Sequence, residues 1–125
     1  MEFALVFPIF ILLLAGMIDF GMGLYSYMNV INSAREGARL GVTNCVATNC
    51  TAAVTARVQA NSAGLNPAVT VQCKTSADVN IACSSTVAGD KSSVTVTATY
   101  TYTMIWPILA GNQIPMKSSM KMVMD

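Results

Sequence analysis

Residues 3–18, FALVFPIFILLLAGMI, decide the fold of this chain, because none of these sixteen residues is charged. Glu2 and Asp19 lie at the two ends of the apolar run. The run is shorter than the about 20 residues that an α-helix needs to cross a bilayer. Beyond Asp19, however, the sequence stays mostly apolar as far as Ile31. We therefore expect one helix that continues past Asp19 and is apolar on all sides in its first half.

Glycine and basic residues mark the end of this helix. From residue 2 to about residue 39 it would be about 57 Å long. Arg35 and Arg39 would lie in the last turns, where positive charge interacts favourably with the helix dipole. Gly41 follows, and we expect the helix to end there.

Pro8 and three glycines interrupt the apolar helix. Pro8 removes one helix hydrogen bond, so the carbonyl of Ala4 needs another partner in lipid. Both a simple kink in a membrane anchor and a helix that extends locally among packed copies of itself fit this proline. Gly16, Gly21 and Gly23 allow other helices to approach closely.

The first residues differ from a signal peptide. A signal peptide starts with Lys or Arg and ends at a small-residue cleavage site. This chain begins Met1-Glu2, without a basic segment. We expect a mature chain from which a leader has been removed.

Composition excludes several classes of function. The length of 125 residues is that of one domain, with 54% hydrophobic residues, 10% charged residues and a net charge of +1. A chain so close to neutral has no electrostatic basis for binding nucleic acid. Histidine is absent, which removes the commonest general base and the commonest neutral metal ligand. We expect no enzyme activity, no catalytic residues, no cofactor and no metal site.

Four cysteines, Cys45, Cys50, Cys73 and Cys83, allow three disulfide connectivities. Their spacing is not a zinc pattern. An even number of cysteines beside an export-type N-terminus favours disulfides over free thiols. Local pairing, Cys45–Cys50 and Cys73–Cys83, is the easiest geometrically.

The residues after the helix predict a small α/β head. Residues 51–65 have an amphipathic pattern that predicts a second helix, with Thr51 as its N-cap. The period then changes to two, which predicts strands at 69–72, 79–83 and 93–103 and a last strand from residue 114. Turns are expected at 88–91 and from Trp106 to Gly111. The fold class is therefore α+β, with a helix over 1–41 and a head with an antiparallel sheet over 42–125.

Methionines alternate along the last strand. Met116, Met120, Met122 and Met124 share one face, and Lys117 and Lys121 lie on the other. A row of methionines can bind a soft metal, but packing under a sheet is the more common role of such a row.

Three motifs in the first forty residues resemble one known family. They are EFALVFP at 2–8, GMIDFG at 16–21 and AREGAR at 34–39. With VTV at 94–96, YTY at 100–102, Pro107 and SSM at 118–120, the chain is similar to TadE/TadG-like pilins and pseudopilins. Members of this family usually have the glutamate further from the cleavage point than Glu2 is here, which would alter its pairing with the terminal amine of a neighbouring subunit.

This resemblance implies a type IV pilin-like subunit of a Tad-type filament. A prepilin peptidase would cleave it, its helix would hold it in the cytoplasmic membrane, and the pilus assembly machinery would draw it into an extracellular homo-oligomeric filament. Two alternatives remain open: a minor pseudopilin of a Tad-type pilus or secretion machine, and a membrane-anchored adhesive domain.

In a filament, the helices would form the core and the heads would coat the outside. The residues expected to mediate assembly are Glu2, Phe3, Phe7, Pro8, Leu12, Leu13, Gly16, Asp19, Phe20, Gly21, Arg35 and Arg39. Asp19 must find a partner in a dry core. It either pairs with Arg35 or Arg39 of another subunit, or bonds locally to backbone or water while the arginines form a solvated face.

Overall fold

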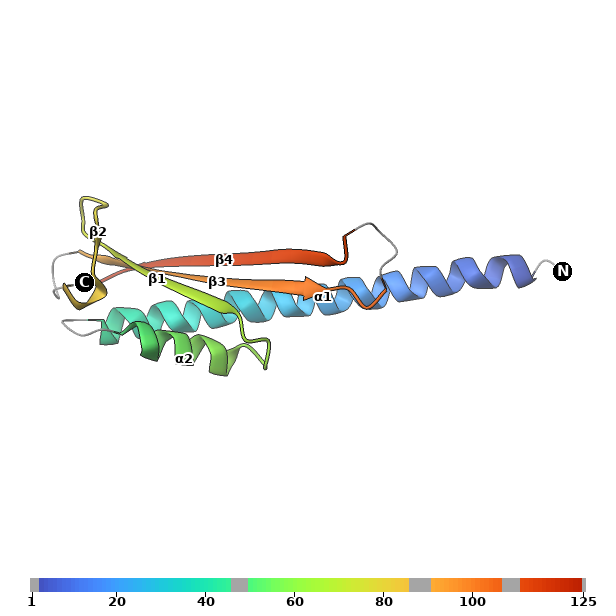
Figure 1. Ribbon diagram of the computed structural model, residues 1–125, viewed down its shortest axis with the longest axis horizontal. Helices are drawn as coiled ribbons and strands as arrows, with labels where there is room; N and C mark the ends of the chain where they lie inside the picture. Colours follow the sequence, from blue (N-terminus) through green and yellow to red (C-terminus); the bar gives the residue numbers. More distant parts are fainter. Residues whose placement is uncertain (1–2, 46–49, 86–90, 107–110, 125) are drawn as a thin grey trace.

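The structure is a computed structural model that describes residues 3–45, 50–85, 91–106 and 111–124. One long helix, α1 (Phe3–Asn44), runs through the molecule, and its first half projects beyond everything else (Figure 1). The second half lies beside a short helix, α2 (Thr51–Asn61), and a sheet. The α+β class predicted from the sequence is confirmed.

The sheet has four antiparallel strands in the order β2-β1-β3-β4. The strands are β1 (Ala68–Lys74), β2 (Asn80–Ile81), β3 (Ser93–Thr103) and β4 (Gln113–Val123). A 3₁₀ turn, η1 (Cys83–Ser85), follows β2. The two longest strands, β3 and β4, pair over eleven residues from Ser93↔Val123 to Thr103↔Gln113 and run along α1 (Figure 1).

The core lies between the two helices and one face of the sheet. Val94, Val96 and Ala98 of β3 are fully buried, as the strict alternation of that strand predicts. α1 contributes Val30, Ala34 and Ala38, and α2 contributes Val54 and Val58. The core of the head therefore contains residues on both sides of the expected division at residue 41.

Small residues bring α1 close to its neighbours. A Cβ built on Gly37 would overlap the side chain of Val58, and one built on Gly41 would lie 2.9 Å from Val94. The prediction that α1 ends at Gly41 is wrong for this reason: Gly41 is a contact point inside the helix, which continues to Asn44. Arg35 and Arg39 are consequently not in its last turn.

α2 and β2 are shorter than the pattern predicts, whereas β1 is longer than the expected strand at 69–72. α2 ends at Asn61 rather than Leu65, because Ala63, Gly64 and Asn66 adopt positive φ angles. Its N-cap is Cys50, with no side-chain cap hydrogen bond, and not Thr51. The strand expected at 79–83 is reduced to β2, since Cys83 lies in η1.

The methionine row of β4 packs towards the core. Met116 and Met124 are buried, and Met120 and Met122 are half-buried against the core. Ser118 is buried in the same row. The expected turn at 88–91 and the connection from Trp106 to Gly111 lie largely outside the described residues.

Candidate membrane and assembly surface

The first half of α1 has large apolar side chains on every side, and none of them is covered by the head. All described residues before Ala15 are exposed, including Phe3, Phe7, Leu12 and Leu13. α1 is the one helix among the described residues that is long and apolar enough to cross a membrane. Such a surface is stable only in lipid or against other apolar chains.

Burial begins along one stripe of α1. Ala15, Asp19, Gly23, Ser26 and Val30 are buried at helical spacing, so α1 meets the head along this single face. The opposite faces remain uncovered: Phe20 is 75% exposed, and nothing lies within 4 Å of a Cβ built on Gly16 or Gly21. Gly23, by contrast, lies against Tyr102 and Met116 of its own chain.

The aromatic residues at the free end of α1 contact each other. The rings of Phe3 and Phe7 stack with their centroids 5.9 Å apart. Pro8 lies inside α1, which continues past it as a regular helix. Glu2, the first residue of the expected assembly set, lies outside the described residues.

Asp19 is buried, and its carboxylate accepts hydrogen bonds from the chain that follows β3. The backbone N–H of Ile105 donates to Oδ1 at 3.1 Å, and that of Trp106 donates to Oδ2 at 3.0 Å. The hydroxyl of Tyr102 lies 3.4 Å from Oδ1 and 3.4 Å from the Asp19 carbonyl oxygen. Asp19 thus bonds to backbone groups of its own chain, which is one of the two alternatives that the sequence analysis gives for it.

The Tyr102 hydroxyl keeps its proton in this position. Burial raises the pKa of Tyr102 above its ordinary value of 10.0, and the negative charge and hydrogen bond of Asp19 raise the pKa further. The hydroxyl therefore remains a donor to the carboxylate.

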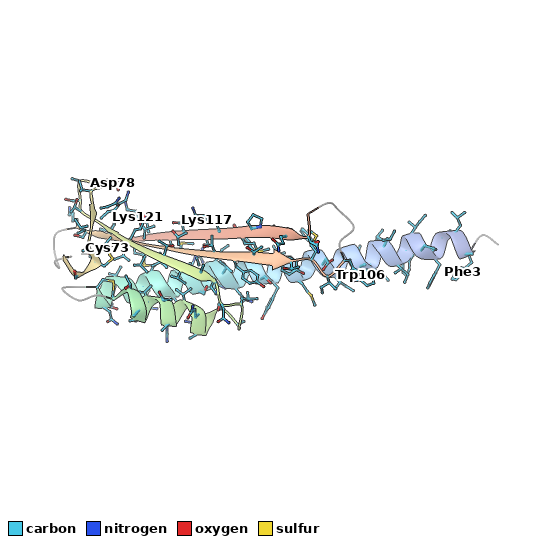
Figure 2. All side chains as sticks on the ribbon, in the orientation of Figure 1. Phe3, Cys73, Asp78, Trp106, Lys117 and Lys121 are labelled. Carbon is cyan, nitrogen blue, oxygen red and sulfur yellow. A yellow bond between two sulfur atoms is a disulfide. The ribbon has the colours of Figure 1, made fainter. Side chains whose placement is uncertain are left out.

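An apolar cavity of about 230 Å³ adjoins this cluster. Gly16 and Phe20 of α1 line one side of it, and Tyr102, Trp106 and Ile114 line the other. The cavity lies where the sheet ends and α1 leaves the head, close to the labelled Trp106 (Figure 2).

Arg35 and Arg39 lie on the part of α1 that covers the head, far from Asp19. Both are exposed. Among the residues that the structure describes, neither arginine forms an ion pair with Asp19; the charged contact nearby is Arg57–Glu36 at 3.9 Å. Pairing between Asp19 and an arginine of another subunit stays a prediction.

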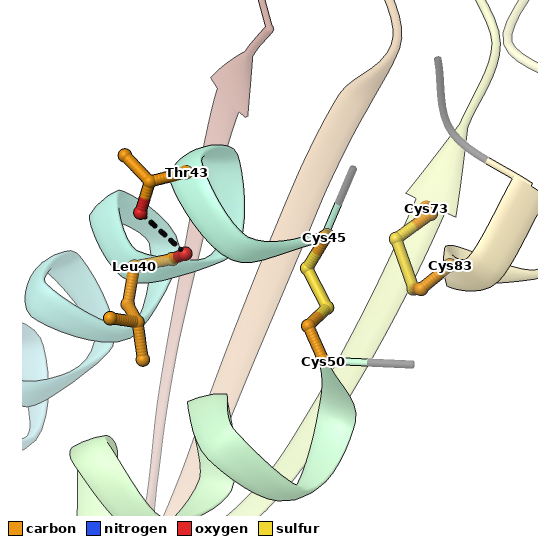
Figure 3. Close-up of a disulfide and its surroundings, with 6 residues drawn as sticks. All are labelled: Leu40, Thr43, Cys45, Cys50, Cys73 and Cys83. Carbon is orange, nitrogen blue, oxygen red and sulfur yellow. Dashed lines mark hydrogen bonds between the residues drawn. A yellow bond between two sulfur atoms is a disulfide. The ribbon is translucent and has the colours of Figure 1, made fainter. Parts of the chain in front are cut away.

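Two disulfides lie at the distal end of the head (Figure 3). Cys45–Cys50 joins the end of α1 to the start of α2, and Cys73–Cys83 joins β1 to η1. These are the two local pairs that the spacing favours. Beside Cys45, the Thr43 hydroxyl donates to the Leu40 carbonyl at 3.0 Å.

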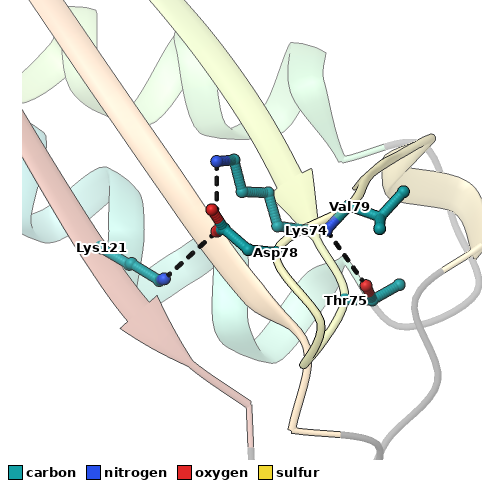
Figure 4. A network of polar contacts seen from close by, with 5 residues as sticks. All are labelled: Lys74, Thr75, Asp78, Val79 and Lys121. Atoms are coloured by element: carbon teal, nitrogen blue, oxygen red, sulfur yellow. Dashed lines mark hydrogen bonds and ion pairs between the residues drawn. The ribbon is translucent and has the colours of Figure 1, made fainter.

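Charged side chains gather at the same end. Lys74 lies 3.2 Å from Asp78, and Lys121 lies 3.8 Å from the same oxygen (Figure 4). The Val79 N–H donates to the Thr75 hydroxyl at 3.3 Å and closes the turn before β2. Exposed pairs of this kind add little stability.

Sequence reasoning recognised that Asp19 needs a partner but did not identify Tyr102, Ile105 or Trp106. Their hydrogen bonds come from a segment 83 to 87 residues away, and two of the three donors are backbone groups. A backbone donor leaves no signal in the sequence.

The fold and this surface together are those of a protein with one long apolar helix and a disulfide-bonded α+β head, an arrangement that suggests membrane association. Residues 1–39, which include most of α1, match the family model described as TadE-like protein. No curated protein and no solved structure matches the chain.

Proposed function

We propose that this chain is a structural subunit of an extracellular Tad-type filament, held in the cytoplasmic membrane by α1 before assembly. The observation that supports this most is the first half of α1, whose apolar side chains are exposed on all sides. Burying one large apolar side chain contributes roughly 1.5–3 kcal/mol. When subunits leave the membrane, burial of these side chains in a bundle of helices would replace the favourable contacts that they made with lipid.

The distribution of small residues on α1 supports helix packing between copies. Gly16 and Gly21 have open space around them within the chain, so another helix could approach there. Leu12, Leu13 and Phe20 lie one helical turn from Gly16 with exposed side chains, and Phe3 and Phe7 continue the exposed apolar surface toward the N-terminus. A prepilin peptidase and the pilus assembly machinery would be the partners during maturation.

Leu12→Asp tests the proposal. The charge would be buried without a partner in a filament core, which costs several kcal/mol per subunit. We expect the variant to lose sheared filaments while its head keeps both disulfides. Asn32→Asp is the matched control, because it adds the same charge to an exposed position on the same helix.

The measurement is the amount of this chain in sheared filaments and in the membrane fraction. Normal filaments from Leu12→Asp would contradict the proposal. Filaments that contain the chain only in trace amounts would instead favour a minor pseudopilin. A full-length chain that binds its target fully on cells without filaments would favour a membrane-anchored adhesive domain.

A further inference from the structure

A region without charges extends well beyond the apolar first half of α1. Residues 20–34 and 92–116 contain no Asp, Glu, Lys or Arg. Asp19 is thus the single charged residue between Phe3 and Ala34, and its carboxylate is occupied by Ile105, Trp106 and Tyr102. The end of the head from which α1 projects is therefore uncharged on the helix and on the sheet alike.

The depth of α1 in a bilayer follows from the number of residues that a membrane span needs. A spanning helix needs about 20 residues, so a span that starts at Phe3 reaches about Met22. Asp19 would lie just inside this boundary, where an unpartnered carboxylate is costly. Its two backbone N–H donors and the Tyr102 hydroxyl supply the partners that lipid cannot.

The same hydrogen bonds place Ile105 and Trp106, which follow β3, at the same level as Asp19, near the membrane boundary. Ile105 and Trp106 are bound to Asp19, yet their side chains are 57% and 51% exposed. The Met104 N–H donates to the Asn112 carbonyl at 2.9 Å and closes the base of the connection. The side chains of Ile105 and Trp106 are thus held beside α1, at the depth where Trp is favoured in membrane proteins.

Exposed tyrosines complete the same level of the molecule. Tyr25 and Tyr27 are 63% and 40% exposed. Tyr25 lies about 5 Å beyond Met22 along the helix, within the headgroup region. Tryptophan and tyrosine at one depth are typical of the interface between lipid and water.

We infer that Ile105 and Trp106 form a second membrane contact, in which these two residues lie in the headgroup region of the lipid bilayer and fix the depth of the head. The occupant of this surface is phospholipid, because the surface is continuous with the apolar span of α1 and has no charge. The inference concerns the chain in the membrane and does not depend on the filament proposal.

Trp106 provides the test, because it is the single tryptophan of the chain. The full chain would be reconstituted in phosphatidylcholine–phosphatidylglycerol vesicles at high lipid-to-protein ratio. We expect a blue-shifted emission, protection from aqueous iodide, and stronger quenching by a nitroxide near the lipid headgroup than by one at the acyl-chain end. The control reporter, Trp106→Phe with Val123→Trp, moves the tryptophan to the exposed distal end of β4 and is expected to be quenched by iodide alone.

Three results would overturn the inference. Iodide quenching of Trp106 equal to that of the control reporter would put the connection in water. Stronger quenching from the acyl-chain end would place it in the hydrocarbon core. Protection from both quenchers that disappears as lipid is added would show that a second copy, and not lipid, covers the surface.

Discussion

Asp19 shows how one residue can join two parts of a chain that are far apart in sequence. Its carboxylate accepts from backbone donors 86 and 87 residues away. It thereby fixes the chain after β3 to α1. The residue is 8% exposed, whereas Ile105 and Trp106, whose N–H groups bind it, are themselves exposed.

Asp19→Ala is expected to destabilise the chain. It removes the carboxylate that accepts from the partly buried N–H groups of Ile105 and Trp106, and it leaves the Tyr102 hydroxyl with only the Asp19 backbone carbonyl, which costs about 1–3 kcal/mol. Asp19→Asn keeps one acceptor oxygen, so we expect a smaller loss. Urea unfolding of the full chain in detergent micelles measures both, and unchanged stability of Asp19→Ala would contradict the assignment.

The same position tests the predicted pairing between subunits. If Arg35 or Arg39 of another copy contacts Asp19, Asp19→Asn should weaken filament assembly more than it weakens the isolated chain. Arg35→Gln and Arg39→Gln, alone and combined with Asp19→Asn, form the double-mutant cycle. Strictly additive effects on assembly would reject the pairing.

At the scale of elements, α1 consists of two halves with different environments. The first half has open space around Gly16 and Gly21, and the second half is packed tightly at Gly37 and Gly41. The glycines of the two halves therefore have different roles: those of the first half leave open surface, and those of the second half allow close packing. In the second half, glycine is required by neighbours in the same chain.

Gly37→Ala is expected to destabilise the head. The added methyl group would overlap Val58 and would also meet Val96 at 3.4 Å, so α1 and α2 must move apart. We expect a loss of about 1–3 kcal/mol, the usual cost of overpacking. Gly21→Ala is the matched control: the same change on the same helix meets nothing within 4 Å. Thermal unfolding in micelles checks both, and equal effects would contradict the packing described.

The elements differ in how well the sequence predicts them. β3 has the predicted bounds, because the alternation of Val94, Val96 and Ala98 with threonines directly reflects one buried face. The end of α1 was predicted wrongly, because a glycine in a tight helix contact has the same local signature as a helix stop. The partners of Asp19 could not be predicted, since they are brought to it by the β3–β4 pairing.

The whole molecule is divided along its length. Residues 3–18, towards one end, are apolar and uncharged, and the other end contains both disulfides and the Lys74–Asp78–Lys121 cluster. Disulfides persist in oxidising compartments. The head is therefore expected on the outer side of the membrane that α1 enters.

Replacing Cys73 and Cys83 together by Ser is expected to lower the free energy of unfolding by about 2–4 kcal/mol, because the disulfide closes a loop in the unfolded chain. Cys73 and Cys83 are 10 residues apart, and Cys45 and Cys50 are 5 apart. Because a longer loop gains more from closure, removing Cys73–Cys83 should cost more loop-closure stabilisation than removing Cys45–Cys50. Peptide mapping without reduction gives the pairing directly. Free thiols, or peptides that link 73 or 83 to 45 or 50, would refute it.

The position of β4 at one edge of the sheet has a further consequence for crowded surfaces. An edge strand of eleven residues presents unpaired backbone groups that could recruit the same strand of another molecule and start an aggregate. β4 contains Pro115, which lacks an N–H, and the exposed Lys117 and Lys121, which repel their counterparts. In a filament of the kind proposed, we expect these three residues to keep the β4 edges of neighbouring heads from pairing into a continuous sheet, so that the subunits would associate through α1.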